Sequence, residues 1–120
     1  MGEVFVVDDE VGIRLLLSEI IGQEDFKVTM FDNSENALKR AINEPPQLIF
    51  LDYLIQPIRG DHVVEKLKEA SLDIPVVLIS GMAKEEIESN LGENMVYQVL
   101  EKPFTVDQVK DILNDVKVQQ

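Results

Sequence analysis

The sequence contains no cysteine, which excludes a disulfide framework, a zinc site built on thiolates and a cysteine nucleophile. Basic residues are also few, because 11 Lys and Arg face 23 Asp and Glu and leave a net charge of −12. Phosphate contacts need clustered positive charge, and the basic residues here are scattered, so we expect no direct binding to nucleic acid. Partners with basic or apolar surfaces fit this charge better.

Long hydrophobic runs are absent as well. No apolar stretch approaches the roughly 20 residues that a membrane-spanning helix needs. The N-terminal residues MGEVFVVDDE lack the basic region of a signal peptide. We therefore expect a soluble cytoplasmic protein with no membrane partner. The chain has 120 residues, the usual size of one domain, so residues 1–120 are expected to form a single domain.

What the sequence does contain is a regular alternation of short apolar runs and amphipathic segments. The short runs are typical of buried strands and span residues 4–7, 28–31, 48–51, 76–79 and 96–100. Hydrophobic residues at helical spacing follow each run, at residues 11–22, 37–42, 61–70, 84–91 and 106–116. Right-handed crossovers place such helices on both faces of a parallel sheet. The alternation therefore predicts an α/β fold, a doubly wound parallel sheet of five strands flanked by five helices.

Polar residues stand at the ends of four of the predicted strands. Asp8 and Asp9 follow the first strand, Asp52 the third, Ser80 the fourth and Lys102 lies at the end of the fifth. In an open parallel sheet these carboxyl ends lie side by side. Converging carboxylates repel one another, so the pocket either binds a cation or keeps a raised pKa. Mg²⁺ suits a site with few protein carboxylates and added phosphate oxygens, so the pattern predicts a magnesium-dependent phosphoryl site.

In that site Asp52 would be the nucleophile, and the product would be an aspartyl phosphate. The Lys102 ammonium would pair with one phosphoryl oxygen, and the Ser80 hydroxyl would donate a hydrogen bond to another. Each residue alone has a plainer explanation, because aspartate and serine are common in turns and caps and lysine is common on surfaces. The combination on four strands is what favours the chemistry.

This combination, with Lys102 followed by Pro103, resembles the receiver domain of bacterial two-component response regulators over essentially the whole chain. The resemblance implies a flavodoxin-like sheet with strand order 2-1-3-4-5. It implies that Asp52 takes a phosphoryl group from a phosphohistidine on a sensor histidine kinase or a histidine phosphotransfer protein. The receiver would catalyse its own phosphorylation and dephosphorylation rather than act as an enzyme on other substrates. A surface on the fourth helix, fifth strand and fifth helix would then reach an effector or output domain.

The resemblance also implies how the cation and the phosphoryl group are held. Ser80 and Lys102 would contact the phosphoryl group, and the peptide bond between Lys102 and Pro103 would be cis. The implied Mg²⁺ ligands are the carboxylates of Asp9 and Asp52, the backbone carbonyl of Leu54 and, through water, Asp8.

Two departures from the family pattern, at Val99 and Pro57, and two bulky residues near the site, Leu54 and Met82, affect what we expect. Val99 stands three residues before the lysine, where the family usually has an aromatic switch residue. Tyr97 is expected on the same face of the strand but about 6.6 Å further back, which makes it a poor substitute. Leu54 and Met82 are bulky and apolar at positions that flank the path of attacking water, so we expect slow loss of the phosphoryl group. Pro57 also stands one place late in the loop after Asp52.

Three alternatives remain open. The chain could be an interaction-only receiver whose switch is weakened, as Val99 suggests. A phosphatase that forms its own aspartyl phosphate needs a second acid two residues after the nucleophile, and Leu54 occupies that place. A flavin-binding electron carrier needs a hydroxyl-rich phosphate loop after the first strand, where this chain has acids.

Overall fold

The apolar runs form strands and the amphipathic segments form helices in the computed structural model, which describes residues 2–92 and 95–118. The elements alternate without exception in the order β1 (Glu3–Val7), α1 (Val11–Gln23), β2 (Lys27–Phe31), α2 (Ser34–Asn43), β3 (Leu48–Asp52), α3 (Gly60–Glu69), β4 (Val76–Ser80), α4 (Lys84–Asn90), β5 (Gln98–Glu101) and α5 (Val106–Val118). That residues 1–120 form one independent domain stays a prediction.

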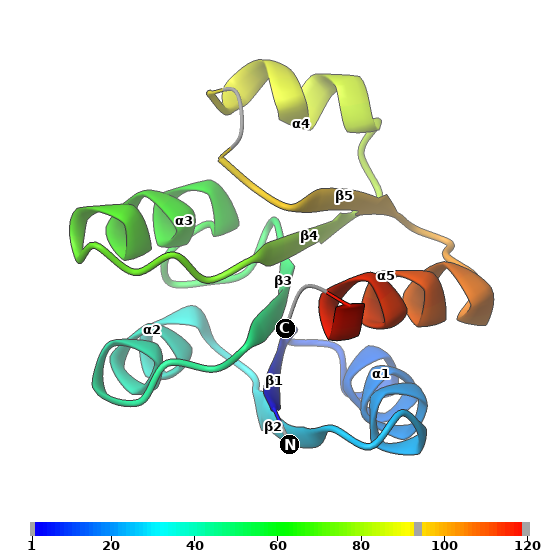
Figure 1. Ribbon diagram of the computed structural model, residues 1–120. Coiled ribbons are helices and arrows are strands. Elements are labelled where there is room, and N and C mark those ends of the chain that lie inside the picture. Colours follow the sequence, from blue (N-terminus) through cyan, green and yellow to red (C-terminus); the bar gives the residue numbers. More distant parts are fainter. Residues whose placement is uncertain (1, 93–94, 119–120) are drawn as a thin grey trace.

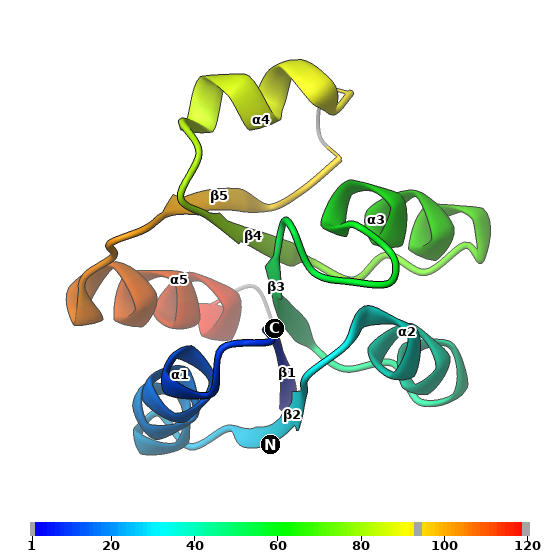
Figure 2. The same ribbon diagram turned by 180° about the vertical axis from the view of Figure 1, so that it is seen from behind.

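All neighbouring strands are parallel, in the order β2-β1-β3-β4-β5. The predicted doubly wound, flavodoxin-like fold is therefore confirmed, including the strand order. Helices cover both faces of the sheet, with α1 and α5 together on one side and α2 and α3 on the other (Figures 1 and 2). The strands β3 and β4 lie in the middle and are buried along their whole length, which explains why they read as continuous apolar runs.

Successive residues of each strand pack into two different cores because side chains alternate between the faces. In β1, Phe5 and Val7 join the core under α2, α3 and α4, whereas Val4 and Val6 join the core under α1 and α5. A packed core thus supports the carboxyl end of the sheet on each face, and this packing fixes the position of the side chains at the strand ends.

Helix ends follow local hydrogen bonding that the sequence largely indicates. A capping box is present at α5: the Thr105 amide donates to Gln108 Oε1 (2.8 Å) and the Gln108 amide donates to Thr105 Oγ1 (3.1 Å). Gly22 does not end α1, which continues through Gln23 and is followed by Asp25 with a φ of 68°. Asp25 takes the left-handed conformation that commonly follows the end of a helix.

The fifth strand begins two residues later than expected. It spans Gln98–Glu101, so Tyr97 lies before it and packs against the core under α1 and α5. Val99 faces the other core, beside α4. The expectation that both side chains share one face is wrong because Tyr97 is outside the regular strand. Across residues 2–92 and 95–118, no helix is long and apolar enough to cross a membrane.

Candidate functional site

The sheet register brings the predicted polar residues to one edge. Val7 pairs with Leu51, Asp52 with Ile79, and Ser80 with Glu101. The strand ends at Asp8, Asp52, Ser80 and Lys102 therefore lie beside one another at the carboxyl edge of the sheet, where an open α/β fold places its ligands.

Asp8 is fully buried and held by its backbone. Its amide donates to the Phe31 carbonyl (3.1 Å), and its carbonyl accepts from the Arg14 guanidinium (2.7 Å). The carboxylate oxygen Oδ1 accepts from the Glu10 amide (2.9 Å), whereas Oδ2 has no hydrogen-bond partner among the described residues. Burial raises the pKa of this carboxyl above its usual value. Asp8 thus presents one unsatisfied oxygen inside the site.

Asp52 is the last residue of β3 and is only 8% exposed. Burial, and after it the negative charge of Asp8, raise the pKa of its carboxyl to about 6, although Lys102 and the Leu54 amide act in the opposite direction. The two acids therefore repel each other in a poorly hydrated place. Such an arrangement costs stability and is typical of functional sites.

Lys102 is the cation of the site. Its Nζ lies 3.4 Å from Glu10 Oε1 and 3.6 Å from Asp8 Oδ2, and in the described part of the chain it forms no ion pair with Asp52. Burial disfavours the charged ammonium, but the carboxylates of Asp8, Asp52 and Glu10 outweigh this effect and raise its pKa. The predicted cis peptide bond between Lys102 and Pro103 is confirmed.

Ser80 is the last residue of β4 and lies at the same carboxyl edge of the sheet. It is 2% exposed, its carbonyl accepts from the Lys102 amide (2.7 Å), and its Oγ accepts from the Met82 amide (2.9 Å). Because Oγ is the acceptor in that contact, its own hydrogen stays available for a ligand oxygen. The Met82 side chain is half-buried beside it.

Glu10 is the residue that the sequence did not single out. Asp8, Asp9 and Glu10 each offer a carboxylate oxygen, and these oxygens lie within 4.8 Å of one another, a group that does not include Asp52. Glu10 stands at the N-cap of α1 without capping it through its side chain. The only sequence feature that could have pointed to Glu10 is its position directly after Asp8 and Asp9. Its contact with Lys102 cannot be read from the sequence.

The donor set suits a hard divalent cation. The oxygens of Asp8, Asp9 and Glu10 are close together, and the buried Asp8 Oδ2 lacks a hydrogen-bond partner among the described residues. Mg²⁺ prefers carboxylate, carbonyl and water oxygens, and all ligands implied by the sequence are of this kind. The residues at this edge therefore fit Mg²⁺. The assignment of its ligands as Asp9, Asp52, Asp8 and the Leu54 carbonyl stays a prediction.

The loop after Asp52, residues 53–59, borders the site. Leu54 is 59% exposed, Ile55 is buried, and the bond between Gln56 and Pro57 is a second cis peptide that the sequence did not predict. Gly60 closes the loop, where an added Cβ would come within 3.0 Å of Tyr53 Cα. Glycine is thus required by close approach of the backbone.

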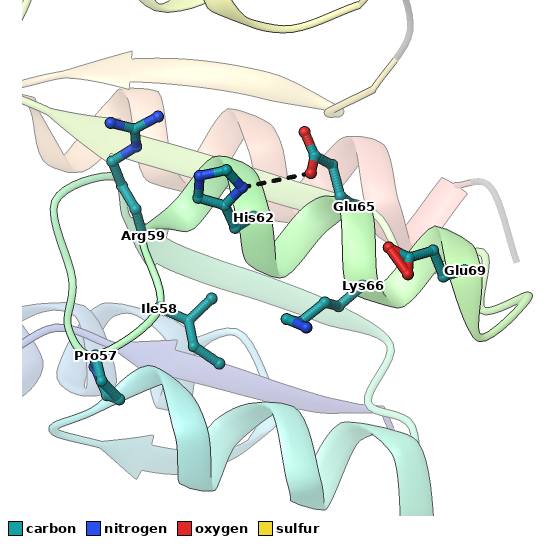
Figure 3. A pocket seen from close by; sticks show the side chains of 7 residues that line it. All are labelled: Pro57, Ile58, Arg59, His62, Glu65, Lys66 and Glu69. Atoms are coloured by element: carbon teal, nitrogen blue, oxygen red, sulfur yellow. Dashed lines mark hydrogen bonds and ion pairs between the residues drawn. The ribbon is translucent and has the colours of Figure 1, made fainter.

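A separate groove lies on the outer side of this loop and α3 (Figure 3). It is lined by Pro57, Ile58, Arg59, His62, Glu65, Lys66 and Glu69, and includes none of the predicted site residues. His62 is exposed there, with Nδ1 3.4 Å from Glu65 Oε2.

The fold and the charged edge together define the class of the protein, a doubly wound α/β domain with an acidic site at the carboxyl edge of its sheet. Residues 4–114 match the family model described as the response regulator receiver domain, and the chain belongs to this family. The family assignment favours the phosphoryl-accepting receiver over the phosphatase and the flavin carrier.

Several known proteins are similar to the chain. Sporulation initiation phosphotransferase F of Bacillus subtilis is 27% identical over 109 residues, which are 91% of this chain and 88% of that protein. Nitrogen assimilation regulatory protein NtrX of Azorhizobium caulinodans is 30% identical over 109 residues, which are 89% of this chain but only 24% of that protein. The chain thus spans nearly the whole of one relative and about a quarter of the other.

Solved structures agree with the fold. The receiver domain of NtrX from Brucella abortus superposes with a TM-score of 0.84 at 30% identity and covers 94% of this chain and 96% of that one. The chemotaxis response regulator CheY4 of Vibrio cholerae has a TM-score of 0.85 at 21% identity, covers 97% of this chain and 98% of that one, and supports the fold alone.

Proposed function

We propose that the chain accepts a phosphoryl group on Asp52 from a phosphohistidine and carries it as a signal. The observation that supports this most directly is that two buried acids, Asp52 and Asp8, lie at the carboxyl edge of the sheet, where Lys102 pairs with Asp8. No structural role requires two repelling carboxylates there. A phosphoryl group with a cation would neutralise the site.

In the proposed transfer, a carboxylate oxygen of Asp52 bonds to phosphorus as the bond from phosphorus to the donor imidazole nitrogen breaks. A proton on the other ring nitrogen lets the histidine leave neutral. Lys102 moves from Asp8 and Glu10 toward the phosphoryl oxygens, and the free Ser80 hydrogen donates to one of them. These groups belong to this chain, so the chain catalyses its own phosphorylation and the later hydrolysis.

Mg²⁺ bound here would neutralise charge on the phosphoryl oxygens. We assign its ligands as the carboxylates of Asp9 and Asp52, the Leu54 carbonyl and, through water, Asp8. Asp8 Oδ2 is suited to the last role because it is buried without a hydrogen-bond partner among the described residues. Glu10 lies close enough to Asp8 and Asp9 to take part from outside the inner ligands.

The donor is a sensor histidine kinase or a histidine phosphotransfer protein, which works with the chain in the cytoplasm. Its imidazole must reach Asp52, so it must contact the surface around Lys102. That surface is apolar: Val11, Leu15 and Leu16 of α1 are exposed, and Phe104 lines a groove beside Lys102 and Leu16. Exposed apolar groups next to a reacting centre suit a protein partner.

The signal leaves through α4, β5 and α5 toward an effector or an output domain. A receiver that only interacts, with a weakened switch, is the second candidate. It is favoured by Val99, which is buried at the switch position, and by Tyr97, which packs into the other core and cannot replace it.

The test is incubation with acetyl phosphate and Mg²⁺, followed by intact mass spectrometry. We expect one phosphoryl adduct on the wild type and on Asp32→Asn, a control that removes an exposed acid at the same edge of the sheet. Asp52→Asn should give none. An adduct that persists in Asp52→Asn, or no adduct on the wild type, would exclude the proposal.

A further inference from the structure

Ser34, the first residue of α2, is fully buried and makes two hydrogen bonds to the loop that follows Asp52. Its amide donates to the Gln56 carbonyl (3.0 Å), and its Oγ accepts from the Ile58 amide (2.8 Å). One residue of α2 therefore holds the loop on both sides of Pro57. Figure 3 shows Pro57 and Ile58 on the side of the loop that faces α2.

The ends of the loop are fixed by other contacts. The Tyr53 amide donates to the Ile79 carbonyl (2.9 Å), the Gly60 amide donates to the Tyr53 carbonyl (2.8 Å), and the Ile55 amide donates to the Asp52 carbonyl (3.2 Å). These bonds secure the loop where it leaves β3 and where it enters α3. In the part of the chain that the structure describes, the two bonds from Ser34 are the hydrogen bonds that reach residues 54–58 from another helix.

The position of Pro57 explains why a side-chain hydroxyl is needed. Proline has no amide hydrogen, so Pro57 cannot be held through its own nitrogen. Ile58 carries the first amide after it, and Ser34 Oγ accepts that hydrogen. An alanine at position 34 would keep the bond to Gln56 but leave the Ile58 amide without this acceptor.

We propose that Ser34 is a positioning residue for the metal site, because its two bonds fix the loop that carries the Leu54 carbonyl. The inference rests on the proposed function, which takes that carbonyl as a ligand of Mg²⁺. Leu54 is two residues before Gln56, and the carbonyl of Gln56 is held directly by Ser34. Residues outside the ligand set that fix ligand orientation change metal affinity without touching the metal.

The first experiment measures Mg²⁺ binding by isothermal titration calorimetry without any phosphodonor. Ser34→Ala should raise the dissociation constant roughly five-fold, the effect of losing about one neutral hydrogen bond. Lys39→Gly is the matched control, because it weakens the same helix at an exposed position away from the loop. Urea unfolding of both variants measures how much stability each one loses, so that the two can be compared.

Weaker binding in Ser34→Ala alone supports the proposal. Equal binding in all three proteins overturns it, and so does equal weakening in both variants, since that would reflect general destabilisation. Absence of Mg²⁺ binding in the wild type would overturn the proposed function itself. Wild-type binding with no effect of Ser34→Ala overturns only the role of Ser34.

The second experiment uses the wild type alone and so does not depend on how a variant folds. Coupling between two sites is reciprocal, so if the Ser34 bond favours Mg²⁺ binding, bound Mg²⁺ must favour the bond. Hydrogen exchange of the Ile58 amide should slow about five-fold when Mg²⁺ saturates the protein, the same factor by which the dissociation constant rises. Unchanged exchange at Ile58 would overturn the proposal.

Discussion

The amino end and the carboxyl end of the parallel sheet carry charged side chains in opposite electrostatic situations. At the amino end, both carboxylate oxygens of Glu3 are paired, one with the Arg40 guanidinium and the other with the Thr29 hydroxyl. Burial raises the pKa of Glu3, but these hydrogen bonds and the charge of Arg40 outweigh it and lower the pKa overall. At the carboxyl end, burial and like charge raise the pKa of Asp52 and burial raises that of Asp8.

This difference in pKa indicates that the charges at the amino end stabilise the fold, whereas those at the carboxyl end serve ligand binding. A paired carboxylate favours the folded state, whereas two buried acids of like charge oppose it. The carboxyl end retains that unfavourable arrangement because a cation and a phosphoryl group can relieve it. The amino end has no such ligand and is satisfied by the protein itself. Substitutions at the two ends should therefore change stability with opposite signs.

The largest change in stability should come from breaking the amino-end pair. Glu3→Ala removes both hydrogen bonds and leaves the partly buried Arg40 without its acid, so we expect the free energy of unfolding to fall by about 2 kcal/mol. Urea unfolding measures this. The control Lys39→Ala breaks the exposed pair with Glu35 and should cost less than about 0.5 kcal/mol. Equal losses in both variants would show that the Glu3 cluster is not a special source of stability.

Removing charge at the carboxyl end should have the opposite sign. Asp52→Asn keeps the shape of the side chain and removes the repulsion with Asp8, so we expect the free energy of unfolding at pH 7.5 to rise by about 1.5 kcal/mol without metal. Asp32→Asn, an exposed acid, should change it little. A loss of stability in Asp52→Asn would mean that Asp52 supports the fold, and the contrast between the two ends would fail.

The sequence predicted the carboxyl end far better than the amino end. The apolar strands that end at Asp8, Asp52, Ser80 and Lys102 can be recognised in the sequence, and the parallel topology brings their ends together. Glu3 and Arg40 are 37 positions apart and follow no motif, so only the packing of α2 on the sheet reveals their contact. The same holds for the bonds from Ser34 to the loop, because a side-chain hydroxyl that meets a distant amide leaves no periodic signal.

The carboxyl end can be tested further through the lifetime of its phosphoryl group. Leu54 and Met82 are apolar residues beside Asp52 and Ser80, and polar replacements should let water approach. We expect the double variant Leu54→Asn, Met82→Asn to lose the phosphoryl group about ten-fold faster, a change of about 1.4 kcal/mol in the barrier. Decay after removal of acetyl phosphate is followed by intact mass. The control Ile42→Asn, an exposed apolar residue of α2, should leave the rate unchanged. An unchanged rate in the double variant would show that these side chains do not shield the site.

The smallest expected effect is the pH dependence that separates the two ends. The folded protein holds a proton on Asp52 up to a pH of about 6, whereas the unfolded chain releases it near the ordinary aspartate pKa of 3.8. The folded state therefore binds more protons between these values, so stability contributed by Asp52 is present at low pH and is lost as pH rises through about 6.

Between pH 5 and pH 7 the metal-free wild type should accordingly lose about 1 kcal/mol more stability than Asp52→Asn, measured by urea unfolding at both pH values. Asp8 also has a raised pKa and is present in both proteins, so the difference reports the ionisation of Asp52 together with its repulsion of Asp8. Glu3 acts with the opposite sign, because its pKa is lowered from 4.5 and its contribution is lost only as pH falls through that lowered value. A wild type and Asp52→Asn with parallel pH profiles above pH 5 would mean that Asp52 is ionised like an ordinary surface acid, and the repulsion that distinguishes the carboxyl end would be absent.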